Sequence, residues 1–137
     1  MSHCIFCQIV SGRAPASVVY EDDLVMAFMD LNQPNPYKVL LIPREHRETI
    51  YELDDDLAAA IFQATVKIAR AIQAASACDG LNIIQSNGLA AQQDVFHFHL
   101  HLLPRYHNDA IVLAWDFSRS DRDVLDRLAG DIRARLQ

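Results

Sequence analysis

Three histidines alternate with apolar residues in the segment of the chain with the clearest chemical pattern, residues 93–105. The order is His97-Phe98-His99-Leu100-His101, with Phe96 before it and Leu102 after it. Successive side chains of a β-strand point to opposite faces, so the histidines share one face and the apolar residues share the other. A purely solvated strand face more readily carries Thr, Lys or Glu than a row of imidazoles that titrate near neutrality. The pattern therefore indicates a chemical role for the histidine face.

Two kinds of chemistry use such a row: a catalytic metal held by histidines, or a histidine that attacks the substrate directly. At roughly 3.3 Å per residue, His97 and His101 lie about 13 Å apart along a straight strand, too far for both to bind one ion. A central histidine with flanking partners suits attack at phosphorus, because neutral imidazole is a good nucleophile and water can resolve the labile intermediate. This interpretation makes His99 the nucleophile.

Cys4 and Cys7 form a C-x-x-C pair, which is typical of a zinc site or of a redox dithiol. A redox pair normally opens a helix after a β-strand, and nothing upstream of Cys4 supplies that strand. A zinc ion needs two more ligands, for which His46 and His97 are the candidates. The alternative is that both cysteines are small, half-buried apolar residues.

Five β-prone runs and two amphipathic patterns indicate which elements position these side chains. The expected strands cover residues 18–21, 24–29, 38–42, 81–85 and 96–103, and the first two form a hairpin. Apolar residues at helical spacing from Leu57 to Ala75 predict a long helix, with Asp54 as its cap and Gly80 just past its end. Leu125, Leu128, Ile132 and Leu136 predict a second helix behind residues 120–123. The order of elements indicates an α+β domain with an antiparallel sheet.

Length, composition and charge narrow the class of protein. The 137 residues, 51% of them hydrophobic, are expected to form a single domain over residues 1–137. The net charge of -6 argues against binding to a nucleic acid polymer, which needs a basic face. A signal peptide and a membrane span are both missing from the pattern, so we expect a cytoplasmic protein without a membrane partner.

The motif His97-Phe98-His99-Leu100-His101-Leu102-Leu103 resembles the His-φ-His-φ-His-φ-φ signature of the histidine-triad (HIT) family, in which φ is apolar. Further segments fall in the family's order: Cys4-Ile5-Phe6-Cys7, Val19-Tyr20-Glu21-Asp22-Asp23, Ala27-Phe28-Met29-Asp30, Leu40-Leu41-Ile42-Pro43-Arg44-Glu45-His46, Gly88 and Pro104-Arg105. The chain is similar to the Hint-type nucleoside phosphoramidase branch with an N-terminal CxxC. The resemblance implies a HIT-like fold, with an antiparallel sheet of about five strands, one long helix and a C-terminal helix.

The resemblance also implies roles for individual residues. His99 would attack the α-phosphorus, His101 would lie near the phosphate or leaving group, His97 would hold the neighbouring imidazole through its backbone, and Gln93 would orient the phosphate. The nucleotide would contact Ile5, Phe6, Ile9, Phe28, Asp30, Leu31, Ser86, Gln93, Val95, His99 and His101, with Asp30 accepting hydrogen bonds from the ribose. Cys4, Cys7, His46 and His97 would hold a structural zinc. No organic cofactor is implied, and the expected assembly is a homodimer.

This sequence departs from the common family pattern at three places. Tyr37-Lys38 stands where many relatives have Gly-His, Ser86 stands where many have Asn, and Asp94 occupies a position often held by Ser or Thr. Lys38 is either a donor to phosphate or a solvated lysine at a strand start. Asp94 would repel a phosphate unless it turns away or is neutralised. We expect these changes to alter substrate preference and to leave the class of hydrolase unchanged.

The leading functional hypothesis is a hydrolase (EC class 3) that cleaves P–N or P–O–P bonds of purine nucleotide conjugates through a nucleotidyl-histidine intermediate. A dinucleoside polyphosphate hydrolase or phosphorylase would use the same His99 chemistry on a longer substrate. A non-catalytic nucleotide-binding partner protein would not need His99 as a nucleophile.

Overall fold

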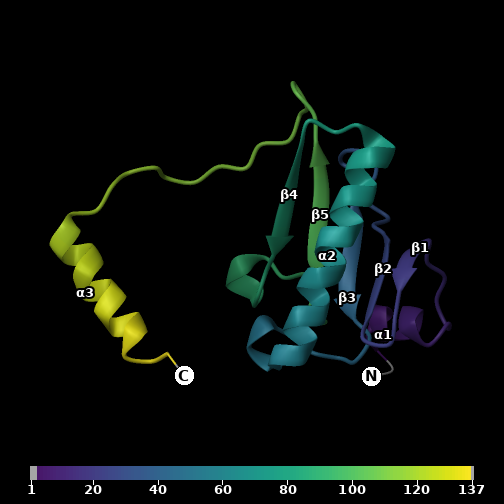
Figure 1. Cartoon of the computed structure of the whole chain (residues 1–137), viewed down its shortest axis with the longest axis horizontal. Coiled ribbons are helices and arrows are strands. Elements are labelled where there is room, and N and C mark those ends of the chain that lie inside the picture. Colours follow the sequence, from purple (N-terminus) through teal and green to yellow (C-terminus); the bar gives the residue numbers. More distant parts are fainter. Residues whose placement is uncertain (1–2, 137) are drawn as a thin grey trace.

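A five-stranded antiparallel sheet with one long helix forms the body of the protein. The computed structural model describes residues 3–136 (Figure 1). The strands are β1 (Val18–Glu21), β2 (Val25–Met29), β3 (Val39–Pro43), β4 (Gly80–Gln85) and β5 (Leu100–Arg105), and the order across the sheet is β1-β2-β3-β5-β4. The helices are α1 (Ile5–Val10), α2 (Asp55–Ser76) and α3 (Arg122–Arg133), with short 3-10 turns at Ile50–Glu52 and Leu89–Ala91. The predicted α+β class of fold, with an antiparallel sheet of five strands, is confirmed.

Helix α2 covers one face of the sheet, and its ends follow from local chemistry. The Asp54 side chain accepts a hydrogen bond from the Leu57 N–H at 2.8 Å, as the sequence predicts for the cap. At the other end Ala77 adopts a left-handed conformation (φ 53°). The prediction that Gly80 lies just past the helix end was wrong, because the helix already ends at Ser76, Ala77 makes the turn and Gly80 begins β4. Every second residue of β2, β3 and β5 packs against α2 on this face of the sheet: Val25, Ala27, Val39, Leu41, Leu100 and Leu102.

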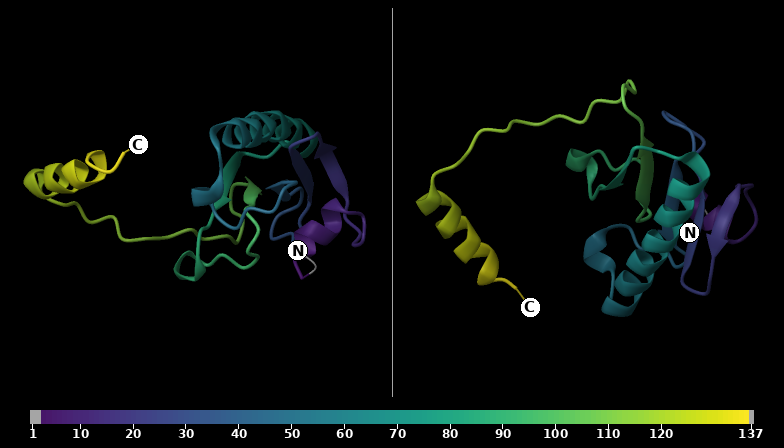
Figure 2. Two further views of the ribbon diagram at one scale, coloured as in Figure 1. Left: turned by 90° about the horizontal axis from the view of Figure 1, so that it is seen from below. Right: turned by 45° about the horizontal axis from the view of Figure 1, so that its top comes forward.

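Helix α1 lies on the opposite face of the sheet from α2 (Figure 2). Phe6 of α1 packs with Met26, Phe28, Leu40 and Ile42 in a second apolar cluster. Leu40 of β3 pairs with His101 of β5 across the ladder, so the two side chains share this face. The small helix α1 was not expected from the sequence, because its six residues carry too short a pattern to show a period.

The histidine segment is only partly a strand. The predicted strand 96–103 was wrong at its start, since β5 begins at Leu100. Strand β4 ends opposite Leu100, and the pairing of β3 with β5 also stops there, so residues 96–99 have no strand beside them. The Phe98 N–H instead donates to the Arg47 carbonyl at 2.6 Å. Phe98 is buried as predicted, whereas Phe96 is 40% exposed and does not join the apolar face.

The C-terminal segment leaves the sheet after β5 and ends in α3, which lies away from the rest of the fold (Figures 1 and 2). Asp109 accepts hydrogen bonds from the side chains of Arg105 and Asn35, and these bonds anchor the chain where it leaves the sheet. The predicted apolar stripe of α3 is exposed along its length. Within residues 3–136, no helix is long and apolar enough to cross a membrane.

Candidate functional site

The His99 imidazole is buried on the side of the sheet that carries α1, and a backbone carbonyl fixes its orientation. Its Nδ1 lies 2.7 Å from the His97 carbonyl oxygen, and its side chain is 4% exposed. Because a carbonyl only accepts, Nδ1 carries a proton in this contact. The edge of the Phe6 ring packs against His99 with ring centroids 5.2 Å apart, which fixes the plane of the imidazole. The other nitrogen, Nε2, is therefore the one available for chemistry.

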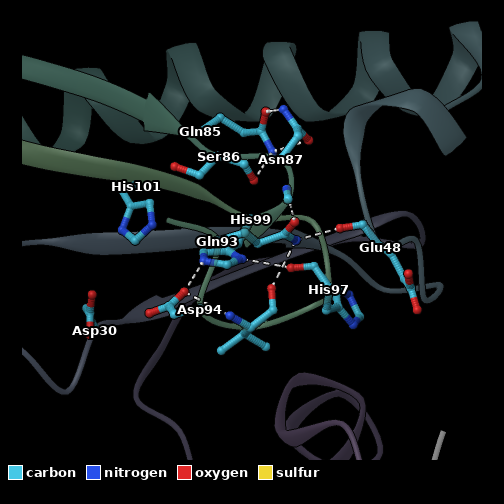
Figure 3. A network of polar contacts seen from close by, with 12 residues as sticks. Asp30, Glu48, Gln85, Ser86, Asn87, Gln93, Asp94, His97, His99 and His101 are labelled. Carbon is cyan, nitrogen blue, oxygen red and sulfur yellow. Dashed lines mark hydrogen bonds and ion pairs between the residues drawn. The ribbon is translucent and has the colours of Figure 1, made fainter. Parts of the chain in front are cut away.

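Asp94 lies beside that nitrogen. Its Oδ1 is 3.2 Å from His99 Nε2, and its side chain is 74% exposed (Figure 3). Burial would raise the pKa of the Asp94 carboxyl, but backbone N–H groups and the nearby His99 hold it below its ordinary value. A hydrogen bond between these two groups requires a proton on one of them. Asp94 must therefore turn away before Nε2 can use its lone pair as a nucleophile.

His101 neighbours His99 and contacts a buried lysine. The two imidazole centroids are 4.9 Å apart, and His101 Nδ1 lies 2.8 Å from Lys38 Nζ. The Lys38 ammonium also pairs with the Asp30 carboxylate, and both side chains are about nine-tenths buried. Burial, with the Lys38 charge next in importance, lowers the pKa of His101 to about 4. His101 is thus a neutral imidazole at physiological pH.

Gln93 holds the loop that approaches His99. Its side-chain NH₂ donates to the carbonyls of Glu48 (2.7 Å) and Val95 (3.1 Å), and its Oε1 accepts from the Gly88 N–H at 2.8 Å (Figure 3). Both of its N–H donors are thus engaged with the backbone. In this arrangement Gln93 shapes the loop, and contact with a phosphate through these donors would require one of the bonds to break.

A second cluster joins the beginning of α1 to the histidine segment. Cys4 Sγ lies 3.3 Å and Cys7 Sγ 3.6 Å from His97 Nδ1, and Cys7 Sγ lies 3.3 Å from His46 Nδ1. The four ligand atoms lie within 4.8 Å of one another. His97 Nε2 is 2.8 Å from the Pro43 carbonyl, so Nε2 carries the proton and Nδ1 turns its lone pair to the cysteines. Burial lowers the pKa of His97 to about 4.

These distances fit a tetrahedral metal site. Metal–sulfur and metal–nitrogen bonds of about 2.3 and 2.05 Å at tetrahedral angles place sulfur and nitrogen about 3.6 Å apart. The observed S···N separations are 3.3 to 3.6 Å. Cys4, Cys7, His46 and His97, the set expected from the sequence, can therefore hold a metal ion.

The residues expected to contact the nucleotide are only partly gathered around His99. Phe6 and Phe28 are buried in edge-to-face contact at 5.5 Å, in the apolar cluster beside His99. Ile9 and Val95 pack against the same cluster. Ser86 directly follows β4, whose last residue, Gln85, pairs with Leu100, the residue between His99 and His101. Ile5 is 45% exposed, and Leu31 is almost fully exposed, at 99%.

Lys38 is the residue whose place the sequence left open. It lies at the beginning of β3, buried, and in contact with both Asp30 and His101. Lys38 lies two residues before Leu40, and residues two apart in a strand share a face, so this spacing would have placed Lys38 on the same face as His101. The interpretation as a solvated lysine was therefore wrong.

An α+β fold whose antiparallel sheet carries three alternating histidines, in the segment leading into β5 and at the start of that strand, is typical of the histidine-triad class of proteins. The sequence profile of the HIT domain matches residues 11–108. "Protein hit" of Bacillus subtilis is 41% identical over 137 residues, covering 98% of this chain and 94% of that protein. A crystal structure of a HIT family member from Bacillus subtilis superposes with a TM-score of 0.94 at 40% identity, covering 98% of each chain. The chain belongs to the HIT family.

Relatives with more specific names also match. Adenylylsulfatase HINT3 of Arabidopsis thaliana is 35% identical over 108 residues, covering 79% of this chain and 55% of that protein. Adenosine 5'-monophosphoramidase HNT1 of Saccharomyces cerevisiae is 28% identical over 135 residues, covering 98% and 83%. The crystal structure of a Zn-bound histidine triad protein from Mycobacterium smegmatis has a TM-score of 0.77 at 33% identity, covering 95% and 98%. The family and these enzymatic relatives support a nucleotide hydrolase.

Proposed function

We propose that this protein hydrolyses phosphoramidate-type conjugates of purine nucleoside monophosphates through a covalent intermediate on His99. The observation that carries the proposal is the contact of His99 Nδ1 with the His97 carbonyl at 2.7 Å. It fixes the tautomer whose unprotonated Nε2 is the nucleophile, and it stabilises the positive charge that develops on the ring during attack. The names of HINT3 and HNT1 support an adenylyl-type substrate.

The reaction has two displacements at phosphorus. In the first, the Nε2 lone pair of His99 forms a bond to the α-phosphorus, the P–N bond of the substrate breaks with its electron pair on nitrogen, and the leaving amine takes a proton from solvent. In the second, water attacks phosphorus and gives up a proton to solvent, the P–Nε2 bond breaks with its electron pair returning to His99, and the nucleoside monophosphate leaves with His99 neutral again. Such transfers depend mainly on positioning and on stabilisation of charge. His101 lies next to His99 to contact the phosphate or leaving group.

The assay that tests this proposal is intact-protein mass spectrometry after a brief acid quench with adenosine 5'-phosphoramidate. We expect an adenylyl adduct on the wild type and none on His99→Ala, with AMP released by the wild type alone. His101→Ala serves as a second variant that keeps the nucleophile. An adduct that persists in His99→Ala would refute the assignment of the nucleophile.

Absence of an adduct and of AMP release by the wild type would contradict the phosphoramidate proposal. Dinucleoside polyphosphate substrates would then be the next to test with the same quench. Nucleotide binding that persists without turnover of either substrate would favour a non-catalytic nucleotide-binding protein.

We further propose that the metal of the Cys4, Cys7, His46 and His97 cluster is zinc, as named for the Mycobacterium smegmatis structure. Two sulfur and two nitrogen ligands are a typical structural zinc set with no open position. The ion would stabilise the junction between α1 and the histidine segment and take no part in the reaction. Because His97 also provides the carbonyl that holds His99, the metal site supports the orientation of the nucleophile.

A homodimer accounts for the apolar surface that one chain leaves exposed. The stripe of α3 includes Leu128 and Ile132, 45% and 66% exposed, and the segment before it exposes Trp115. On α2, Phe62 is 63% exposed. A second copy that covers these side chains would remove them from water, and light scattering coupled to gel filtration would give twice the chain mass of 15.4 kDa.

A further inference from the structure

Lys38 places a positive charge inside the site, between the expected ribose ligand and the expected phosphate ligand. Its Nζ lies 2.8 Å from His101 Nδ1 and pairs with the Asp30 carboxylate. An ammonium only donates hydrogen bonds, so His101 Nδ1 accepts and the ring proton lies on Nε2. We propose that Lys38 is a positioning residue that keeps His101 neutral, with its Nε2–H presented to the phosphate or leaving group.

The backbone around Lys38 is built to hold this side chain in place. Tyr37 has φ 75°, in the left-handed region that non-glycine residues rarely occupy. Gln33 then binds both backbone groups of Lys38, accepting from its N–H at 3.0 Å and donating to its carbonyl at 2.8 Å. The same carbonyl accepts from the Asp30 N–H at 3.1 Å. These hydrogen bonds fix the backbone of Lys38, so its side chain, which is flexible in solution, starts from a defined position next to the site.

The charges around His101 explain why a cation is needed there. The titratable groups that act on the ring are Lys38 from the start of β3, Asp30 after β2, and His99 and Asp94 from the segment leading into β5. The two carboxylates favour an imidazolium, whereas the Lys38 ammonium opposes it. Without Lys38, the Asp30 carboxylate would become the dominant charge beside His101 Nδ1 and would attract a proton to that nitrogen. A ring protonated on Nδ1 could turn toward Asp30 and away from the substrate.

The contact also couples two halves of the nucleotide site. Asp30 Oδ1 accepts from the Asn32 N–H at 2.9 Å while Oδ2 pairs with Lys38. A ribose that binds Asp30 would therefore change the position of the Lys38 ammonium, which also contacts His101. This part of the inference, unlike the state of the His101 ring, rests on the proposed function.

The first experiment measures the ring directly. Long-range ¹H–¹⁵N spectra of the full-length wild-type protein, without nucleotide, report which nitrogen of each imidazole is protonated, and a His101→Asn spectrum assigns the resonance. We expect His101 with Nε2–H and an unprotonated Nδ1 from pH 8 down to pH 5.5. Protonation of Nδ1 in the wild type anywhere in that range would overturn the proposal, whether or not any variant folds.

The second experiment removes the charge. In Lys38→Met the pKa of His101 is expected to rise above its wild-type value, because the Lys38 charge no longer opposes a second ring proton, while burial still lowers the pKa; in Lys38→Arg, which keeps charge and donors, the ring stays neutral. The exposed Lys67, the chain's other lysine, provides the matched control Lys67→Met, which should leave the titration of His101 unchanged. If His101 titrates in Lys38→Met as it does in the wild type, Lys38 does not set its state.

Turnover of adenosine 5'-phosphoramidate gives the functional consequence. We expect kcat of Lys38→Met at pH 6 to fall about tenfold to a hundredfold, as when one donor to a transition state is misplaced, with partial recovery at pH 8 and in Lys38→Arg. A merely structural role would lower kcat equally at both pH values, which would contradict the inference. If the wild type shows no turnover, the proposed function fails, whereas the spectra still decide the role of Lys38.

Discussion

Replacing Cys7 with Ser should distinguish a metal site from a cluster of half-buried polar side chains. Cys7 Sγ lies 3.3 Å from His46 Nδ1 and 3.6 Å from His97 Nδ1, so it contacts both nitrogen ligands of the proposed zinc. Cys78 lies outside the cluster and is also half-buried, which makes Cys78→Ser a matched control. We expect one zinc per chain in the wild type and in Cys78→Ser, and a large loss of zinc from Cys7→Ser.

The effect on stability follows from mass action. Free zinc at a hundred times its dissociation constant stabilises the folded state by about 2.7 kcal/mol. For a chain of this length 1 kcal/mol corresponds to roughly 3 to 5 °C in Tm, so a chelator should lower the Tm of the wild type by about 10 °C. The chelator should leave the Tm of Cys7→Ser almost unchanged, because that variant has already lost most of its zinc.

The assay combines metal analysis of the purified proteins with thermal unfolding in the presence and absence of a chelator. Equal zinc content in Cys7→Ser and Cys78→Ser would refute the assignment of the ligands. A wild-type Tm that does not respond to the chelator, together with a metal content near zero, would refute the metal site altogether.

Three further predictions concern the end of α2, the acid beside His99 and the neutral His101. Ala77→Gly should raise the free energy of unfolding by about 1 kcal/mol, measured with urea, because glycine adopts φ 53° without strain; a loss of stability would contradict this. Asp94→Asn should raise kcat/KM about three- to fivefold for adenosine 5'-phosphoramidate and at least as much for a dinucleoside polyphosphate, since Asp94 lies beside the nitrogen that attacks the anionic α-phosphate of both; an unchanged kcat/KM for both would count against that reason. Because the folded-state pKa of His101 is about 4, below its unfolded value near 6.5, the unfolded state binds more protons, so stability should fall as pH falls from 6.5 toward 4. His101→Asn should flatten that dependence, and an unchanged slope would disprove the contribution of His101.

The sequence predicted the sheet, α2 and α3 because their apolar residues repeat over enough positions to define a period. The metal cluster could also be named in advance, and the structure brings its four ligand atoms within 4.8 Å of one another. Helix α1 is too short for that kind of evidence. The start of β5 was misplaced because alternation between Phe96 and Leu103 does not tell whether a neighbouring strand exists to pair with it.

The environment of Lys38 could not be derived from local pattern. Its burial depends on the left-handed turn at Tyr37 and on Gln33, five residues earlier, binding its backbone. The contact of Asp94 with His99 likewise depends on how the loop before β5 folds, which Gln93 fixes by donating to the carbonyl of Glu48, 45 residues earlier in the chain. Roles that follow from residue type alone were easier to assign than roles set by such tertiary contacts.

The sheet order β1-β2-β3-β5-β4 has a consequence for how the chain acquires its structure during synthesis. Strands β1 to β3 can pair in turn as they leave the ribosome, but β4 is bonded only to β5, which comes after it in the chain. Until residues 100–105 emerge, the edge of β3 and all of β4 lack their partner. The strand that follows the histidine segment is therefore the one that closes the sheet, so the site forms last. A nascent chain that stalls before Leu100 would expose an apolar edge and have no assembled site.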